Sequence, residues 1–124
     1  MRFESLRVNG KRLRKSLEAM AQIGSTPGGG VSRLALSDED KEARNFFIHW
    51  LRAIELNVTV DEMGNFFGKK AGKNRDSPAV MSGSHIDSQP NGGRFDGILG
   101  VMVMLEVLRT LQENGIETQR SLYI

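Results

Sequence analysis

The sequence contains no cysteine among its 124 residues. This absence excludes disulfide bonds, thiolate metal sites and cysteine nucleophiles, so any metal has to be bound by His, Asp or Glu side chains. It also fits a reducing compartment, and we expect a cytoplasmic protein.

A strong charge of one sign and a long apolar run are lacking as well. Seventeen Lys and Arg residues stand against fifteen Asp and Glu residues, a formal net charge of +2, so neither a nucleic-acid partner nor a membrane partner is expected. The most apolar segment, residues 98–111, contains Glu106 and Arg109 and is shorter than the roughly 20 residues that cross a bilayer. The first residues are interrupted by Glu4 and do not have the pattern of a signal peptide.

Three segments have the spacing of helices. Apolar residues recur at helical intervals between Asn9, an N-cap residue, and Gly24, a stop signal. A capping box at residues 37–40 begins a second helix with an aromatic and aliphatic face. Residues 98–112 are apolar nearly all round, which predicts a central helix enclosed on several sides. His49 has no acidic or histidine partner one turn away, so we expect a partly solvated helix residue.

Strand patterns alternate with these helices. Residues 57–61 and 66–69 flank a Gly-Asn turn and predict a hairpin, residues 79–83 predict a short buried strand, and residues 120–124 begin another. This order predicts an α/β fold with a sheet flanked by helices. Because the final strand looks unfinished, we expect residues 1–124 to be a single, truncated segment of a domain.

A glycine-rich segment, residues 25–31, follows the first helix. We interpret it as a flexible linker or a mobile active-site loop, because consecutive glycines tolerate unusual backbone angles. No Gly-Lys-Ser/Thr sequence follows it, which argues against a phosphate cradle.

The loop of residues 83–97 combines residue types that bind metals. Loops that follow sheet strands are where α/β proteins place their sites. His85 and Asp87 are two residues apart, so on an extended backbone their side chains point to the same side, and one can bind a metal while the other orients it. Asp96 lies at the start of a helix, where a carboxylate is stabilised by the helix dipole and can bridge two cations. A capped loop with an incidental histidine is the alternative interpretation.

The sequence of this loop resembles a known motif. Residues 83–100, Gly-Ser-His-Ile-Asp-Ser-Gln-Pro-Asn-Gly-Gly-Arg-Phe-Asp-Gly-Ile-Leu-Gly, are similar to the first metal-binding motif of the dinuclear (M20) metallohydrolases, which include aminoacylases, dipeptidases and N-carbamoyl-amino-acid amidohydrolases. Residues 26–37, 61–65 and 91–96 narrow the resemblance to the branch of N-carbamoyl-L-amino-acid hydrolases, allantoate amidohydrolases and β-ureidopropionases. It implies the N-terminal part of a zinc-exopeptidase-like catalytic domain with a mixed β-sheet.

The resemblance also implies roles for individual residues. His85 would bind one metal, Asp96 would bridge two, and Asp87 would be the catalytic-site carboxylate behind the histidine. The implied cofactors are two divalent ions, zinc or manganese, with cobalt or nickel as alternatives. The general base, the remaining ligands and a lid and dimerisation domain are expected beyond Ile124, with a homodimer as the complete protein. Two interpretations stay open for Gln89, Asn91 and Arg94, which could contact substrate or hold the loop together.

The activity implied for the complete protein is metal-dependent hydrolysis of a linear, non-peptide C–N bond. The substrate would be a small ureido or amide compound such as an N-carbamoyl amino acid or allantoate, with release of ammonia and carbon dioxide. There are two alternatives to this activity. One is an aminoacylase or dipeptidase with the same metal pair, and the other is an inactive truncated product. We expect the 124-residue chain alone to be inactive, because two ligands are fewer than the three that catalytic zinc sites ordinarily use.

Overall fold

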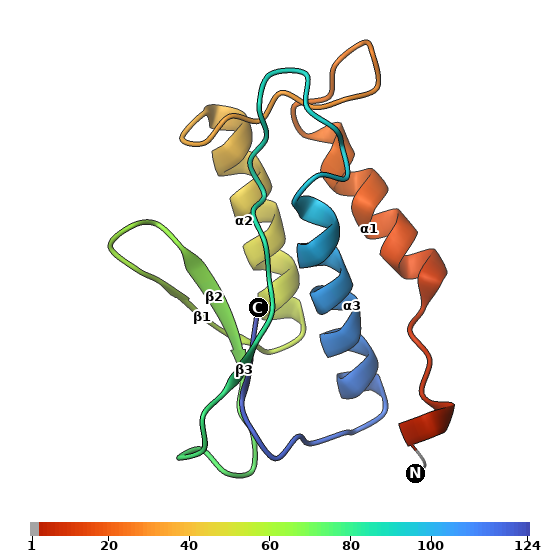
Figure 1. The fold of residues 1–124 in the computed structure, drawn as a ribbon, viewed down its shortest axis with the longest axis vertical. Helices are drawn as coiled ribbons and strands as arrows, with labels where there is room; N and C mark the ends of the chain where they lie inside the picture. Colours follow the sequence, from red (N-terminus) through yellow and green to blue (C-terminus); the bar gives the residue numbers. More distant parts are fainter. Residues whose placement is uncertain (1–2) are drawn as a thin grey trace.

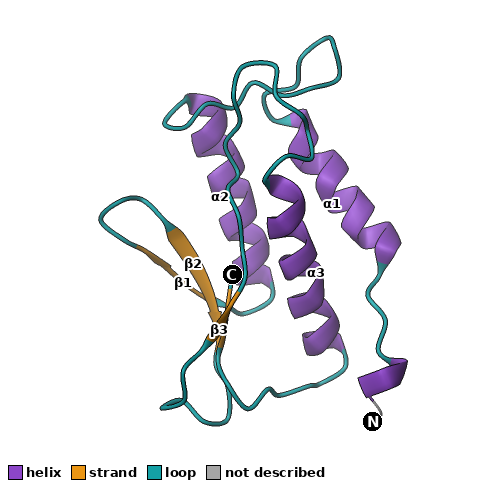
Figure 2. Ribbon diagram, viewed as in Figure 1, coloured by secondary structure: helices purple, strands orange, loops and turns teal. Residues whose placement is uncertain are grey.

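The computed structural model describes residues 3–124, which form three α-helices and one small sheet. Figure 1 shows α3 lying between α1 and α2, with the sheet to one side of the helices, and Figure 2 separates the helical and strand regions by colour. The predicted class, a mixed sheet flanked by helices, is confirmed. The elements in chain order are the short 3-10 helix η1 (Phe3–Ser5), α1 (Gly10–Gln22), α2 (Asp38–Ala53), β1 (Asn57–Val60), β2 (Phe66–Lys70), β3 (Val80–Met81), α3 (Ile98–Glu113) and β4 (Leu122–Tyr123).

The first two helices begin at the predicted capping residues. The Asn9 side chain accepts a hydrogen bond from the backbone N–H of Arg12 at 3.0 Å, and the Ser37 hydroxyl accepts one from the N–H of Asp40 at 3.1 Å. Each bond satisfies a backbone donor that the first helical turn leaves unpaired. After α1 the chain turns at Gly24, whose φ of 76° lies in the left-handed region that glycine tolerates.

The four strands pair in the order β1-β2-β4-β3. The predicted hairpin is confirmed: β1 and β2 are antiparallel, with Asn57 opposite Lys69 and Val60 opposite Phe66. Strand β4 lies between the hairpin and β3, antiparallel to β2 and parallel to β3. The sheet is therefore mixed, and a strand that comes late in the sequence occupies an inner position.

Of two expectations about burial, the one for the strand at residues 79–83 was wrong and the one for α3 is confirmed. The predicted buried strand 79–83 is the two-residue β3, and its Val80 and Met81 are 47% and 61% exposed. Their run of apolar residues suited a strand covered on both faces, but β3 is an edge strand that pairs only with β4 in the part of the chain described. The predicted central position of α3 is confirmed, because this helix lies between α1 and α2 (Figure 1). Leu99 and Val103 are more than 40% exposed, but buried residues occupy most of the circumference of the helix: Ile98, Val101, Met102, Met104, Leu105, Glu106, Leu108 and Thr110.

The core lies between the helices and the sheet. The largest contribution comes from α3, whose Met102, Leu105 and Leu108 are fully buried. Phe47 and Leu51 of α2 and Leu17 and Met20 of α1 belong to the same apolar cluster. No helix within residues 3–124 has the length and apolarity needed to cross a bilayer.

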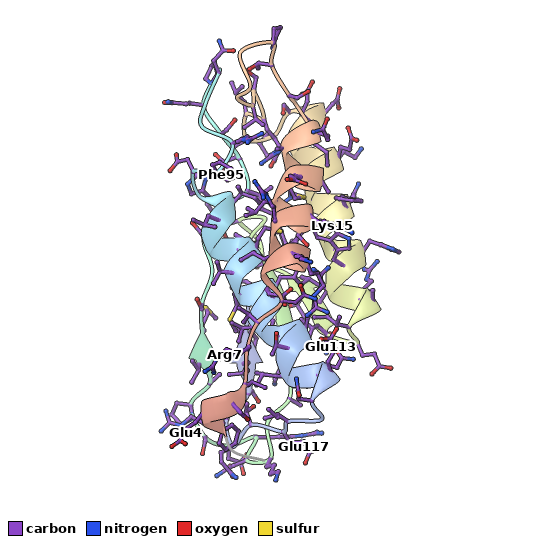
Figure 3. The ribbon with its side chains drawn as sticks, turned by 90° about the vertical axis from the view of Figure 1, so that its right-hand side faces the viewer. Glu4, Arg7, Lys15, Phe95, Glu113 and Glu117 are labelled. Atoms are coloured by element: carbon purple, nitrogen blue, oxygen red, sulfur yellow. The ribbon has the colours of Figure 1, made fainter. Side chains whose placement is uncertain are left out.

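A buried ion pair joins α1 to α3. Glu106 is 1% exposed, and its carboxylate accepts hydrogen bonds from the Arg12 guanidinium at 2.7 and 2.8 Å and from the backbone N–H of Asn9 at 2.9 Å. Arg12 also pairs with Glu113, which Figure 3 labels at one end of α3, with Phe95 near the other. The charge inside the apolar helix is therefore fully paired, as a buried carboxylate requires.

Candidate metal centre

The segment that connects β3 to α3 carries the three predicted metal-site residues. Its first residue, Ser82, donates a backbone hydrogen bond to the Tyr123 carbonyl at 3.0 Å, which continues the β3–β4 pairing. The chain then passes α2 and α3 and turns over the ends of the helices before it enters α3, as the teal segment in Figure 1 shows. The site therefore lies where a sheet strand ends and a helix begins, the position that α/β folds use for ligands.

His85 and Asp87 lie against each other, as their spacing predicted. The His85 Nδ1 atom is 2.9 Å from the backbone carbonyl oxygen of Asp87 and 3.4 Å from its Oδ1 atom. A carbonyl oxygen can only accept, so Nδ1 carries the proton and Nε2 keeps its lone pair free. This is the arrangement of metal-binding histidines, which usually donate their other ring N–H to a carbonyl or carboxylate.

Asp96 lies near His85 in the structure, because its neighbour Gly97 contacts the imidazole. Asp96 is exposed at the entrance to α3, and its backbone N–H donates to the Gly93 carbonyl at 3.2 Å. A Cβ atom placed on Gly97 would lie 2.4 Å from both Cε1 and Nε2 of His85. Gly97, the residue after Asp96, therefore touches the imidazole of His85, although these two residues are twelve positions apart in the sequence.

These donors fit part of a divalent-cation site. One imidazole nitrogen with a free lone pair and one exposed carboxylate are ligand types that zinc and manganese accept. Within residues 3–124, however, no three His, Cys, Asp or Glu side chains gather closely enough to hold an ion. The described part of the chain thus offers an incomplete set of ligands.

A cavity of about 590 Å³ opens beside the histidine. His85 and Asp87 line it, whereas Asp96 does not. The other walls come from α2, from the turn of the β1–β2 hairpin and from the segment that follows β3. Its polar lining residues include Asp40, Arg44 and Asn65, and its apolar lining residues include Phe47, Phe66, Met81 and Ile124.

The three residues with two open interpretations lie outside this cavity. Gln89, Asn91 and Arg94 are all exposed. The backbone N–H of Asn91 donates to the Ser32 hydroxyl at 2.9 Å, and the Gln89 carbonyl accepts from the Gly92 N–H at 3.1 Å. The Arg94 guanidinium stacks on its neighbour Phe95. Gln89 and Asn91 thus hold the loop through backbone groups, and contact of any of the three side chains with substrate stays a prediction.

The glycine-rich segment is a braced loop rather than a free linker. Its Thr26 N–H donates to the Gly30 carbonyl at 2.9 Å, which closes the loop on itself. Val31 and Gly92 exchange two backbone hydrogen bonds of 3.0 and 2.8 Å, and a Cβ on Gly30 would lie 2.5 Å from the Gly92 carbonyl oxygen. Glycine is therefore required at position 30 for close approach to the metal-site loop. His49 is exposed on α2, as expected for a solvated helix histidine.

A buried arginine supports the site and had no predicted role. Arg33 is 2% exposed, and its guanidinium donates to the carbonyls of Met20 and Ile23 at the end of α1 and to that of Ile86 between the two site residues, all at 2.8–2.9 Å. Its backbone also pairs with Ser88. Burial lowers the pKa of Arg33, and the carboxylates of Asp40 and Asp87 oppose that shift. The residue lies inside the 26–37 run that carried the resemblance, but only the fold shows what it touches.

The fold and the site together define an α/β domain with a histidine and carboxylates at the end of a sheet strand, an arrangement suited to hydrolases that use metals. Comparison with known proteins narrows this class. Residues 65–124 match the sequence profile of peptidase family M28. The chain is 40% identical over 122 residues to an N-carbamoyl-L-amino-acid amidohydrolase of Pseudomonas sp. (strain NS671). The match covers 98% of this chain and 30% of the relative.

Solved structures and plant relatives agree with this match. A hydantoinase/carbamoylase family amidase from Burkholderia multivorans superposes with a TM-score of 0.94 and 53% identity, covering 96% of this chain and 29% of that structure. A ureidoglycolate hydrolase of Arabidopsis thaliana is 34% identical over 97% of this chain and 25% of its own length. The chain is thus a homologue of the hydantoinase/carbamoylase amidohydrolases, and the resemblance seen in the sequence is confirmed. The chain spans about three-tenths of the length of these relatives. The M20 grouping stays a prediction, since the matched profile is that of M28.

Proposed function

We propose that this chain supplies part of the active site of a metal-dependent amidohydrolase that cleaves a linear C–N bond in an N-carbamoyl amino acid or a related ureido acid. The observation that carries the proposal is the His85 imidazole, anchored through Nδ1 by the Asp87 carbonyl with Nε2 left free. The names of the relatives support the substrate class. The chain would be one segment of a larger catalytic domain, in a cytoplasmic homodimer completed by a lid and dimerisation domain.

Each site residue has a distinct part in this proposal. His85 would hold a cation through Nε2, Asp96 would supply a carboxylate ligand, and Asp87 holds the orientation of the ring. The group held there would be two divalent ions, zinc or manganese with cobalt or nickel as alternatives, and the chemistry they would supply is Lewis acidity for the hydrolysis. The cavity beside His85 and Asp87 would admit a small substrate. Hydrolysis of an N-carbamoyl amino acid would release the amino acid, ammonia and carbon dioxide.

A segment exchange tests the proposal directly. In the N-carbamoyl-L-amino-acid amidohydrolase of Rhizobium meliloti, which is 43% identical over 121 residues, the matching segment would be replaced by this chain. We expect the hybrid to bind metal and to hydrolyse N-carbamoyl amino acids. Asp96→Asn should leave less than about 1% of the rate, the size of loss seen when one essential electrostatic group is removed. His49→Gln, on the exposed face of α2, should retain the rate of the unaltered hybrid.

The outcomes separate the proposal from its alternatives. Substrates in the assay would be N-carbamoyl amino acids, 3-ureidopropionate, allantoate, ureidoglycolate and simple dipeptides. Preference for dipeptides would favour the second candidate, a peptidase, which the match to peptidase family M28 supports. A folded, metal-loaded hybrid in which Asp96→Asn keeps full activity would contradict the proposal.

The chain by itself gives a further check. We expect it to bind divalent metal weakly and to hydrolyse none of these substrates, because its ligand set is incomplete. Stoichiometric sub-micromolar binding of two metal ions, or turnover by the pure chain, would show that this expectation is wrong.

A further inference from the structure

Gly97 occupies a position where local helix chemistry favours a different residue. It is the N-cap of α3, and no side chain caps the helix there. Ser, Thr, Asp or Asn at an N-cap usually stabilise a helix through such a cap. The φ of Gly97 is 70°, so a residue with a side chain would also be strained. The start of α3 therefore lacks a stabilising feature that α1 and α2 both have.

The space left by the missing side chain is filled by His85. The three heavy atoms nearest to a Cβ built on Gly97 are Cε1, Nε2 and Nδ1 of that imidazole, at 2.4, 2.4 and 2.6 Å. Distances below 3.0 Å are not found between real Cβ atoms and their neighbours, so an alanine at position 97 and the present ring position exclude each other. The ring in turn keeps its Nδ1 atom 2.9 Å from the Asp87 carbonyl.

A second glycine extends the same contact. Gly100 lies one turn further along α3, and a Cβ there would be 3.1 Å from the Cβ of Ser84. Two glycines three positions apart thus let the segment that carries His85 lie directly against the first turn of α3. The contact at Gly97 is the closer of the two and is the one made to the ring.

We propose that Gly97 is a positioning residue for His85, because the absence of a side chain at the start of α3 is what allows the imidazole to lie there with Nδ1 bound and Nε2 free. The part of this inference that concerns metal binding rests on the proposed function. The part that concerns the ring position stands on the geometry alone.

The two histidines of the chain make the test simple. Imidazole 1H–13C and long-range 1H–15N NMR spectra would be recorded for the 124-residue chain, with His49→Gln to assign the two Cε1–H signals. We expect 15N shifts typical of a protonated Nδ1 in His85. Gly97→Ala should move the His85 signal and leave the His49 signal in place. The matched control is Gly115→Ala at the other end of α3, where φ is 62° but nothing lies within 4 Å of the added Cβ.

Metal binding is read from the same spectra. Mn²⁺ added to the chain should broaden the His85 signal before the His49 signal. Gly97→Ala should raise the Mn²⁺ concentration needed for half-broadening by about 10–100-fold, the usual effect of disturbing a group that orients a metal ligand. Gly115→Ala should leave that concentration unchanged.

The results distinguish the two parts of the inference. A His85 signal that Gly97→Ala leaves at its original position would overturn the positioning role. A shifted His85 signal with no Mn²⁺ broadening at His85 in any variant would uphold the positioning role and contradict the metal site of the proposed function.

A thermal measurement keeps the inference testable when Gly97→Ala folds poorly. In the His85→Ala background the ring is gone, so Gly97→Ala should lower the melting temperature no more than Gly115→Ala does. In the background that keeps His85, Gly97→Ala should lower the melting temperature more than Gly115→Ala does. An equal loss in both backgrounds, or failure of the double variant to fold while His85→Ala folds, would show that Gly97 does not act through His85.

Discussion

Replacement of Arg33 by methionine should cost this domain a large part of its stability. The change keeps an apolar side chain of similar length but removes the guanidinium that donates to the carbonyls of Met20, Ile23 and Ile86. A hydrogen bond from a charged group contributes about 1.5–3 kcal/mol, so the simple sum is about 5–9 kcal/mol. Methionine avoids the cost of burying a cation, which offsets part of that sum. We therefore expect the free energy of unfolding to fall by about 3–5 kcal/mol.

Urea unfolding followed by circular dichroism would measure this loss. Arg14→Met is the matched control, because Arg14 lies on α1 with 82% of its side chain exposed and pairs with Glu18 one turn away. Such surface pairs contribute about 0.3–0.5 kcal/mol. The Ser88 amide, which donates to the Arg33 carbonyl at 2.7 Å, should also lose protection from hydrogen exchange in Arg33→Met, because the guanidinium ties this segment to α1. Equal stability losses in the two variants would refute the role given to the buried guanidinium.

Three further predictions concern the ion pair, the core and the site. Burial opposes ionisation of Glu106, but hydrogen bonds from Arg12 and Asn9 outweigh it and lower its pKa below the ordinary value of 4.5. The stabilisation by ionised Glu106 is therefore complete above pH 4.5 and is lost as the pH falls through the lowered pKa. From pH 7 downwards, the urea midpoint should fall less steeply for Glu106→Gln than for the unaltered chain. A parallel decrease in the two proteins would contradict this role of Glu106. Gly68→Ala should destabilise the chain by about 1–3 kcal/mol, since the added Cβ would lie 3.0 Å from Leu51 and Ile124 atoms, whereas Gly28→Ala meets nothing and should change thermal stability by less than about 0.5 kcal/mol. In the hybrid enzyme, His85→Ala should lower the bound metal measured by mass spectrometry, while His49→Gln should not; equal metal content would contradict the ligand role of His85.

Local chemistry made much of the fold predictable. The caps at Asn9 and Ser37 and the Gly-Asn turn of the hairpin depend on residues within a few positions of each other, and all three appear in the structure. The proximity of His85 and Asp87 followed from their spacing of two residues. These features are set by short-range geometry, which a single sequence reveals.

The features that were missed depend on distant partners. The exposure of β3 depends on its place at the edge of the sheet beside β4. The residue patterns of β3 and β4 do not specify the order in which the strands pair. Arg33 contacts three carbonyls from two separate segments, and a lone arginine in a loop gives no sign of burial. No role was predicted for Gly97, because the ring that occupies its space belongs to His85, twelve residues earlier in the sequence. Tertiary packing decides all three.

The strand order also has a consequence for the timing of assembly. During synthesis from the N-terminus, the β1–β2 hairpin can close soon after Lys70 leaves the ribosome, because its two strands are neighbours in the chain. Strand β3 emerges next, but its partner β4 lies on the far side of α3 in the sequence. Val80 and Met81 therefore stay unpaired until α3 and then Leu122 and Tyr123 have been synthesised. The segment that carries His85 begins at that strand, and the hydrogen bond from its first residue, Ser82, to the Tyr123 carbonyl can form only after β4 has been made.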